Sequence, residues 1–195
     1  MKILGFDLGD GESAVTLLDE DSTVEPHVMP LCGKNSLISA VGVKDGRIVI
    51  GEAASVTDGA AEAKVRFKSR YLTDPAASAD VRAFAQGVMN ELVRTQPALM
   101  AEVSRTVVGC PAGWGDGRRE QYAALLESAG FPNVSVVPEP RAAFLYARHA
   151  RGLRVHAQAR DEVLQCRERS RSGHRPHHQK GQKLHRQPQR AQRGR

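Results

Sequence analysis

Residues 106–149 read TVVGCPAGWGDGRREQYAALLESAGFPNVSVVPEPRAAFLYARH, and this stretch decides the fold class of the chain. Two short apolar runs, at 106–110 and 133–137, have the length of buried strands. The first run is followed by a helical pattern that Asp116 can cap, and the second by a helix over 141–149. The apolar face of the first helix is Tyr122, Leu125, Leu126 and Ala129. Strand and helix alternating in this order predict an α/β layer with a parallel component.

The first 50 residues have the character of antiparallel strands. Residues 2–8 form an apolar run that ends in the turn sequence DLGDG, and residues 13–18 form a second run. The two are expected to pair as a hairpin across the glycine-rich turn. Residues 36–43 and 47–50 are expected to form another pair, because the Asp-Gly between them is a strong turn signal.

One long helix is predicted over residues 78–96. Its apolar residues recur at spacings of three and four and mark one face, namely Val81, Phe84, Val88 and Leu92. Ser78 is the expected N-cap and Pro97 the expected stop.

The positive charge of the chain is concentrated at its end. Residues 151–195 hold 13 Lys or Arg and 3 acids, whereas residues 1–150 hold 15 basic and 19 acidic residues. From residue 165 onward, Leu184 is the only large aliphatic side chain. So little apolar surface cannot offset the roughly 1–2 kcal/mol per residue that backbone ordering costs. We therefore expect a folded domain over 1–153 and a disordered basic tail over 154–195.

The cysteines and the N-terminus indicate the cellular compartment. Cys32, Cys110 and Cys166 are odd in number and too widely spaced for a zinc motif, and the first two are expected to be small buried side chains. The opening apolar run is interrupted at Asp7, too early for a signal peptide or a membrane span. A cytoplasmic protein without membrane association is expected.

Three segments carry residue types that suit phosphate chemistry. In the first, Asp7 closes a strand and Gly9 and Gly11 follow, so backbone N–H groups lie beside a carboxylate. Phosphates suit such N–H groups, and a hydrated Mg²⁺ suits the carboxylate. The same pattern is common in plain hairpin turns, so this segment by itself leaves both interpretations open.

The other two segments lie where predicted strands meet predicted helices. One runs from Cys110 to Arg119, and such junctions are frequent ligand sites. The other places Glu139 between two prolines just before a helix. The structural alternatives are a βα loop with a half-buried Trp114, and a first-turn acid that the helix dipole favours.

Taken in order, these segments resemble the ATPase domain of DnaK-like chaperones, the heat shock protein 70 family. GFDLG at 5–9 resembles the first phosphate loop of that family. SLISAV at 36–41, followed by GEAA at 51–54, resembles the next hairpin. RFKSR at 66–70 resembles the segment that holds the catalytic lysine.

Two further matches extend the resemblance to about residues 2–153. VGCPAGW at 108–114 and PEPRAA at 138–143 resemble the family's strand–helix junctions, with no gap in the spacing between them. The resemblance implies an α/β fold with a mixed sheet and helices, the first lobe of an actin/hexokinase-like (ribonuclease H-like) ATPase domain. It also implies ATP and Mg²⁺ as cofactors, and unfolded client proteins and co-chaperones as partners.

The resemblance carries roles to individual positions. Asp7 would face Mg²⁺ through its hydration shell, and backbone groups of Gly9, Asp10 and Gly11 would touch the β- and γ-phosphates. Lys68 would stabilise charge on the γ-phosphoryl group.

Three more roles follow in the same way. Glu139 would orient the attacking water or a metal-bound water. Pro111 and Arg119 would relay the nucleotide state to a peptide-binding domain.

The sequence departs from the family in three places. Asp10 and Gly11 stand where the family has two threonines, and Asp10 adds a negative charge beside the phosphates, which weakens binding unless a metal offsets it. The span between Lys68 and Pro111 is shorter than usual. After Leu153 the second phosphate loop and the second lobe are not found, so at most weak ATP binding and impaired hydrolysis are expected of this chain.

Residues 154–195 have two interpretations. The loss of periodicity and the surge in Arg, His, Gln and Pro suggest frameshifted sequence, whereas the net charge of +10 over residues 151–195 would suit a nucleic-acid-binding arm. The tail lacks the aromatic side chains that stack on bases, so nucleic acid is not an expected partner.

Two other functions also stay open for the whole chain. One is another actin-fold ATPase or kinase, and the other is a non-enzymatic remnant or interaction module.

Overall fold

The computed structural model describes residues 1–23, 25–55, 63–71 and 73–151. The predicted tail over 154–195 and Cys166 lie outside the described residues. Within them, none of the helices has the length and apolarity that a membrane crossing needs.

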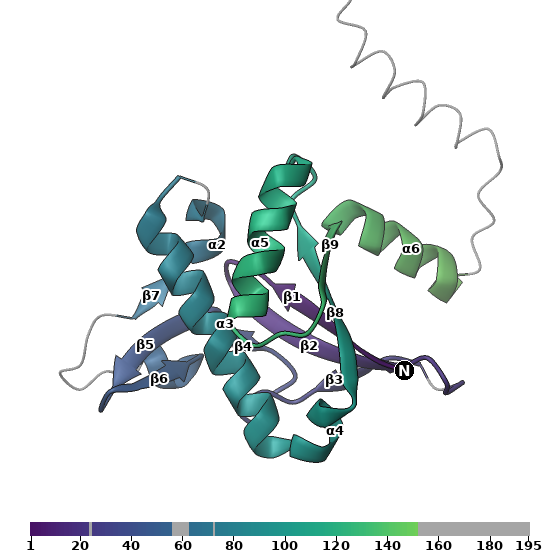
Figure 1. The fold of residues 1–195 in the computed structure, drawn as a ribbon, viewed down its shortest axis with the longest axis horizontal. Coiled ribbons are helices and arrows are strands. Elements are labelled where there is room, and N and C mark those ends of the chain that lie inside the picture. The colour runs from purple at the N-terminus through teal and green to yellow at the C-terminus, as the bar shows by residue number, and fades with distance from the viewer. Residues whose placement is uncertain (24, 56–62, 72, 152–195) are drawn as a thin grey trace, which may run out of the picture. The chain divides into compact units, whose positions relative to one another are not determined.

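The larger sheet mixes antiparallel and parallel pairs, which confirms the predicted α/β class (Figure 1). β1 (Lys2–Leu8) pairs with β2 (Glu12–Asp19) in the expected antiparallel hairpin. The parallel component is β1 beside β8 (Val103–Cys110) and β8 beside β9 (Val134–Pro138). β3 (His27–Met29) continues the sheet on the outer side of β2.

The predicted strand over 36–43 is wrong as a single strand. β4 (Leu37–Ile38) pairs with β2, whereas β5 (Ala40–Lys44) pairs with β6 (Arg47–Ile50) in a smaller sheet. The two halves separate at Ser39 because they hydrogen-bond to different partners.

The predicted hairpin within the smaller sheet is confirmed. β5 and β6 are joined by Asp45 and Gly46, whose φ angles of 51° and 74° suit a tight hairpin turn. On its other side β5 pairs with β7 (Lys64–Val65).

The long helix is α3 (Pro75–Thr95), and the predicted cap is wrong. Asp74 is the N-cap, because its carboxylate accepts a hydrogen bond from the N–H of Ala76 and Pro75 suits the first helical position. Ser78 lies inside the helix, and its hydroxyl donates to the carbonyl of Tyr71. Pro97 lies beyond the helix end but begins a new short helix, α4 (Pro97–Ala101).

The two later helices begin earlier than expected or without the expected cap. Asp116, the expected cap, is the first residue of α5 (Asp116–Ser128). The N-cap is Gly115, which has no side chain that could accept a hydrogen bond from the first turn. α6 (Glu139–Arg151) starts at Glu139, two residues before the predicted start. The remaining helices are single turns, α1 (Glu52–Ser55) and α2 (Phe67–Arg70).

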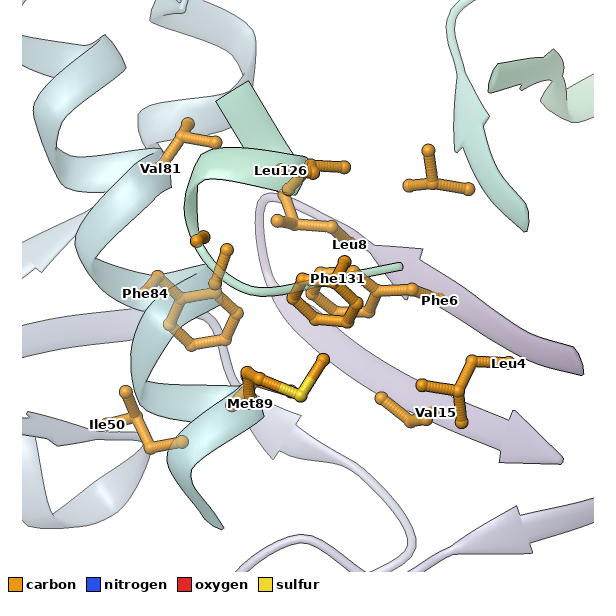
Figure 2. Packing of buried hydrophobic residues seen from close by; sticks show 14 of the residues in the cluster. Leu4, Phe6, Leu8, Val15, Ile50, Val81, Phe84, Met89, Leu126 and Phe131 are labelled. Carbon is orange, nitrogen blue, oxygen red and sulfur yellow. The ribbon is translucent and has the colours of Figure 1, made fainter. Parts of the chain in front are cut away.

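In the core, α5 packs on β9 of the larger sheet, and α3 packs on α5 and on β5 and β6 of the smaller sheet (Figures 1 and 2). Phe6 of β1 stacks on Phe131, with ring centroids 4.9 Å apart and planes within 7°. Phe84 of α3 and Leu126 of α5 are fully buried beside this stack. Apolar burial of this kind, at about 25 cal/mol per Å², is the main term that stabilises the domain.

We expect Gly87→Ala to destabilise the fold although alanine favours helices. A Cβ at Gly87 would overlap Cγ2 of Ile50 and lie 3.1 Å from Cγ2 of Ile48, and β-branched side chains have little freedom to move. The expected loss is about 1–3 kcal/mol in the free energy of unfolding, measured by urea denaturation. Gly117→Ala is the matched control, since nothing lies within 4 Å of its Cβ, and it should stabilise or leave stability unchanged. Equal effects of the two variants would contradict this account.

Candidate functional site

A pocket of about 380 Å³ collects most of the residues that the sequence singled out. Its lining consists of Gly9, Asp10, Lys68, Ser69, Pro111, Trp114 and Glu139. These residues come from the turn after β1, from α2, from the loop after β8 and from the start of α6.

The parallel strands explain why three of these segments meet. β1, β8 and β9 run side by side in the same direction, so the residues that follow them emerge at one edge of the sheet. The carboxyl edge of parallel strands is where open α/β sheets place their ligands. α2 follows β7 of the smaller sheet in the chain and brings Lys68 and Ser69 to the same pocket, and no local pattern predicts that placement.

Lys68 and Glu139 form an ion pair across the pocket, with Nζ and Oε1 2.7 Å apart. The Lys68 side chain is 7% exposed and the Glu139 side chain 47% exposed. Burial disfavours a charged ammonium unless an opposite charge lies close, so Glu139 is what makes the buried lysine tolerable. The pair joins residues 71 positions apart in the chain.

Packing holds both partners of the pair. The ring of Phe67, adjacent to Lys68, is fully buried and lies 5.2 Å from the ring of Phe84. On the other side, a Cβ at Gly109 would lie 3.0 Å from Cγ of Glu139, so glycine lets the glutamate lie close against β8. The ion pair is therefore positioned by the core and by a close backbone approach.

The turn after β1 is tight and tied to its surroundings. The N–H of Gly9 donates to the carbonyl of Glu12 over 3.1 Å, and a Cβ at Gly9 would overlap that oxygen. The carbonyl of Gly11 accepts from the N–H of Ser39. Among the described residues, no acceptor faces the backbone N–H of Asp10 or of Gly11. Two adjacent N–H groups in a fixed turn are suited to an anion.

An aromatic cluster lies beside the pocket. Trp114 is 7% exposed, so it is more deeply buried than the half-buried side chain of the structural alternative for this loop. Its ring lies 5.1 Å from Tyr122, edge to face, and 5.7 Å from Tyr71. Burial raises the pKa of Tyr122 well above its ordinary value, so its phenol stays protonated.

We expect Tyr122→Phe to stabilise the protein. The Tyr122 hydroxyl is buried and has no hydrogen-bond partner among the described residues. Removing an unsatisfied buried hydroxyl should recover about 1 kcal/mol in the free energy of unfolding, measured by chemical denaturation. Tyr146→Phe is the control, because Tyr146 is 73% exposed and its hydroxyl is hydrated. A loss of stability in Tyr122→Phe would mean that the hydroxyl is bonded after all.

Some predicted site residues lie outside the pocket lining. Asp7 is exposed on β1, where its backbone pairs with Ala14. Gly11 follows the lining residues but is not among them. Pro111 lines the pocket, whereas Arg119 forms an ion pair with Asp116 at a second hollow of about 340 Å³. The two predicted relay residues therefore face different hollows.

Ser69 is a lining residue that the sequence did not indicate. Its N–H donates to Oδ1 of Asp10 over 2.9 Å, across 59 positions of the chain. No periodicity or turn signal pairs two residues so far apart. The prediction for Cys110 is confirmed, since it is buried, but the one for Cys32 is wrong: Cys32 is exposed, in a turn with φ of 50°.

No protein-family model matches the chain. Within the described residues, no three His, Cys, Asp or Glu side chains group closely enough to hold a metal ion directly. The site is therefore characterised by its own chemistry: a buried cation, a paired carboxylate and a turn with open N–H groups.

Proposed function

We propose that this chain is the first lobe of an actin-like ATPase domain of the DnaK type, which binds Mg-ATP and by descent assists protein folding. The observation that carries the proposal is the pocket in which Lys68 and Glu139 meet Gly9 and Asp10 of the turn after β1. Such a combination of cation and backbone N–H groups suits phosphate, and the pocket volume lies in the usual range for ligand sites.

Each lining group has a role in this proposal. The N–H groups of Asp10 and Gly11 bind phosphate oxygens, and Lys68 stabilises charge on the transferred phosphoryl group. Before the nucleotide binds, Glu139 neutralises the charge of Lys68. When a phosphate replaces Glu139 as the partner of Lys68, the glutamate orients a water molecule.

The residues present fit a hydrated Mg²⁺ better than a directly bound one. Asp7, Asp10 and Glu139 supply carboxylates near the turn, but no three acidic, His or Cys side chains of the described residues form a cage. Mg²⁺ keeps several waters and is usually bound through few carboxylates and the substrate phosphates. When bound, it would supply charge neutralisation on the phosphates.

Nuclear magnetic resonance of the labelled chain, titrated with Mg-ATP, tests the proposal. We expect millimolar affinity, because the pocket covers only part of a nucleotide, with shifts confined to the amides of Gly9–Gly11, Ser69 and Trp114. Lys68→Met should abolish the shifts. Lys34→Met is the matched control, because Lys34 is an exposed lysine paired with Glu52, away from the pocket. No shifts at saturating Mg-ATP would refute nucleotide binding by this chain.

An interaction module is the second candidate, and three exposed apolar residues of α6 favour it. Phe144, Leu145 and Tyr146 are 50%, 48% and 73% exposed, and consecutive apolar side chains are rarely left to solvent without a use. Sedimentation velocity separates the two functions. Self-association that Leu145→Lys removes, with no response to Mg-ATP, would favour the module over the ATPase.

A further inference from the structure

The single-turn helix that carries Lys68 has no cap of its own. α2 begins after Arg66, which has a left-handed backbone (φ 52°) and makes no side-chain capping hydrogen bond. The N–H groups in the first turn of a helix have no acceptor within the helix. Ser69 is the third residue of α2, the position whose N–H an N-cap side chain normally satisfies.

Asp10 supplies the missing acceptor from a distant part of the chain. Its Oδ1 lies 2.9 Å from the N–H of Ser69, although the two residues are 59 positions apart. The hydrogen bond is charge-assisted, because its acceptor is a carboxylate oxygen. The negative charge of Asp10 is therefore directed at α2, so it opposes phosphate binding less than its position in the turn suggests.

We propose that Asp10 is a positioning residue that caps α2 and thereby holds Lys68 at a set distance from the turn after β1. The identity of the ligand, a nucleotide phosphate, rests on the proposed function, whereas the capping role of Asp10 does not. The same turn that offers the N–H groups of Asp10 and Gly11 holds, through the Asp10 side chain, the helix that offers the ammonium group. The two halves of the phosphate site are thus joined by one hydrogen bond.

The test compares Asp10→Ala with Asp10→Asn in the whole chain without ligand. Asp10→Ala removes the acceptor, so exchange of the Ser69 amide should accelerate roughly tenfold or more. Acylation of Lys68, followed by mass spectrometry, should accelerate severalfold because α2 loosens. Asp10→Asn keeps an acceptor oxygen and should restore most of both effects, which a nonspecific loss of stability would not do.

Asp74→Ala is the matched control. Asp74 caps α3 in the same way, with Oδ1 2.9 Å from the N–H of Ala76. Asp74 also forms a partly exposed ion pair with Arg70 of α2 over 3.5 Å, a kind of pair that contributes little to stability. This variant should therefore accelerate exchange at Ala76 and change Ser69 and Lys68 much less than Asp10→Ala does. Unchanged exchange at Ser69 and unchanged acylation of Lys68 in Asp10→Ala would overturn the proposal.

Titration of the same variants with Mg-ATP separates this inference from the proposed function. Weaker shifts in Asp10→Ala than in Asp10→Asn support both. If the wild-type chain shows no nucleotide response, the ATPase proposal fails, while the exchange and acylation results still decide the role of Asp10.

Discussion

Replacing Phe84 with alanine is expected to lower the free energy of unfolding by about 3–5 kcal/mol. The Phe84 side chain on α3 is fully buried within the hydrophobic core (Figure 2). Its ring lies 5.2 Å from the ring of Phe67 on α2. A cavity at this position removes apolar burial and the contact that anchors α2. Because domains of this size are stable by only about 5–15 kcal/mol, a large fraction of the stability would be lost.

Urea denaturation followed by circular dichroism measures the effect, with Val93→Ala as control. Val93 lies on the same helix but is 47% exposed, so its truncation should change stability by less than about 0.5 kcal/mol. Acylation of Lys68 in Phe84→Ala should also accelerate, since Lys68 follows Phe67. A loss below about 1 kcal/mol would mean that Phe84 does not fill the core as described.

The second large effect is an asymmetry within the Lys68–Glu139 pair. Glu139→Ala leaves the buried ammonium of Lys68 without a partner and should cost about 1–3 kcal/mol, less than for a fully enclosed pair because the pocket admits water. Lys68→Met should cost little or stabilise, because the half-exposed Glu139 regains hydration and methionine fills the space.

A double variant, Lys68→Met with Glu139→Ala, makes the asymmetry measurable. Its stability should be close to that of Lys68→Met alone, because the loss in Glu139→Ala comes from the uncompensated lysine. Glu52→Ala is the control for removing an exposed partner, since Glu52 pairs with Lys34 at the surface and should cost below about 1 kcal/mol. Equal losses in Lys68→Met and Glu139→Ala would contradict the burial argument.

The pocket and its ion pair could be predicted only in part. The resemblance brought Lys68 and Glu139 into one site, and the structure places them 2.7 Å apart. It did not indicate Ser69. It gave the backbone of Asp10 a phosphate contact, and the charge of the Asp10 side chain was expected only to weaken phosphate binding, not to accept a hydrogen bond from Ser69. The hydrogen bond from Ser69 to Asp10 joins residues 59 positions apart and depends on how α2 packs. The local sequence does not indicate that packing.

The errors in the predicted fold have local causes. Ser78 has the residue type of an N-cap, but Asp74 followed by Pro75 makes a better start, and both options lie within one turn. The strand predicted over 36–43 divides at Ser39, because its two halves find hydrogen-bond partners in different sheets. An apolar pattern indicates that a segment forms a strand, but it does not indicate which other strand it pairs with.

The succession of elements follows from local sequence: the first hairpin, the Asp45-Gly46 turn, the long helix and the two strand–helix steps of residues 106–149. Periodicity and turn residues specify these elements, and both act over a few positions. The meeting of Lys68 with Glu139, and the hydrogen bond from Ser69 to Asp10, depend instead on where α2 packs in the folded chain. The burial of Phe67 against Phe84 positions α2, and no local pattern links those two side chains.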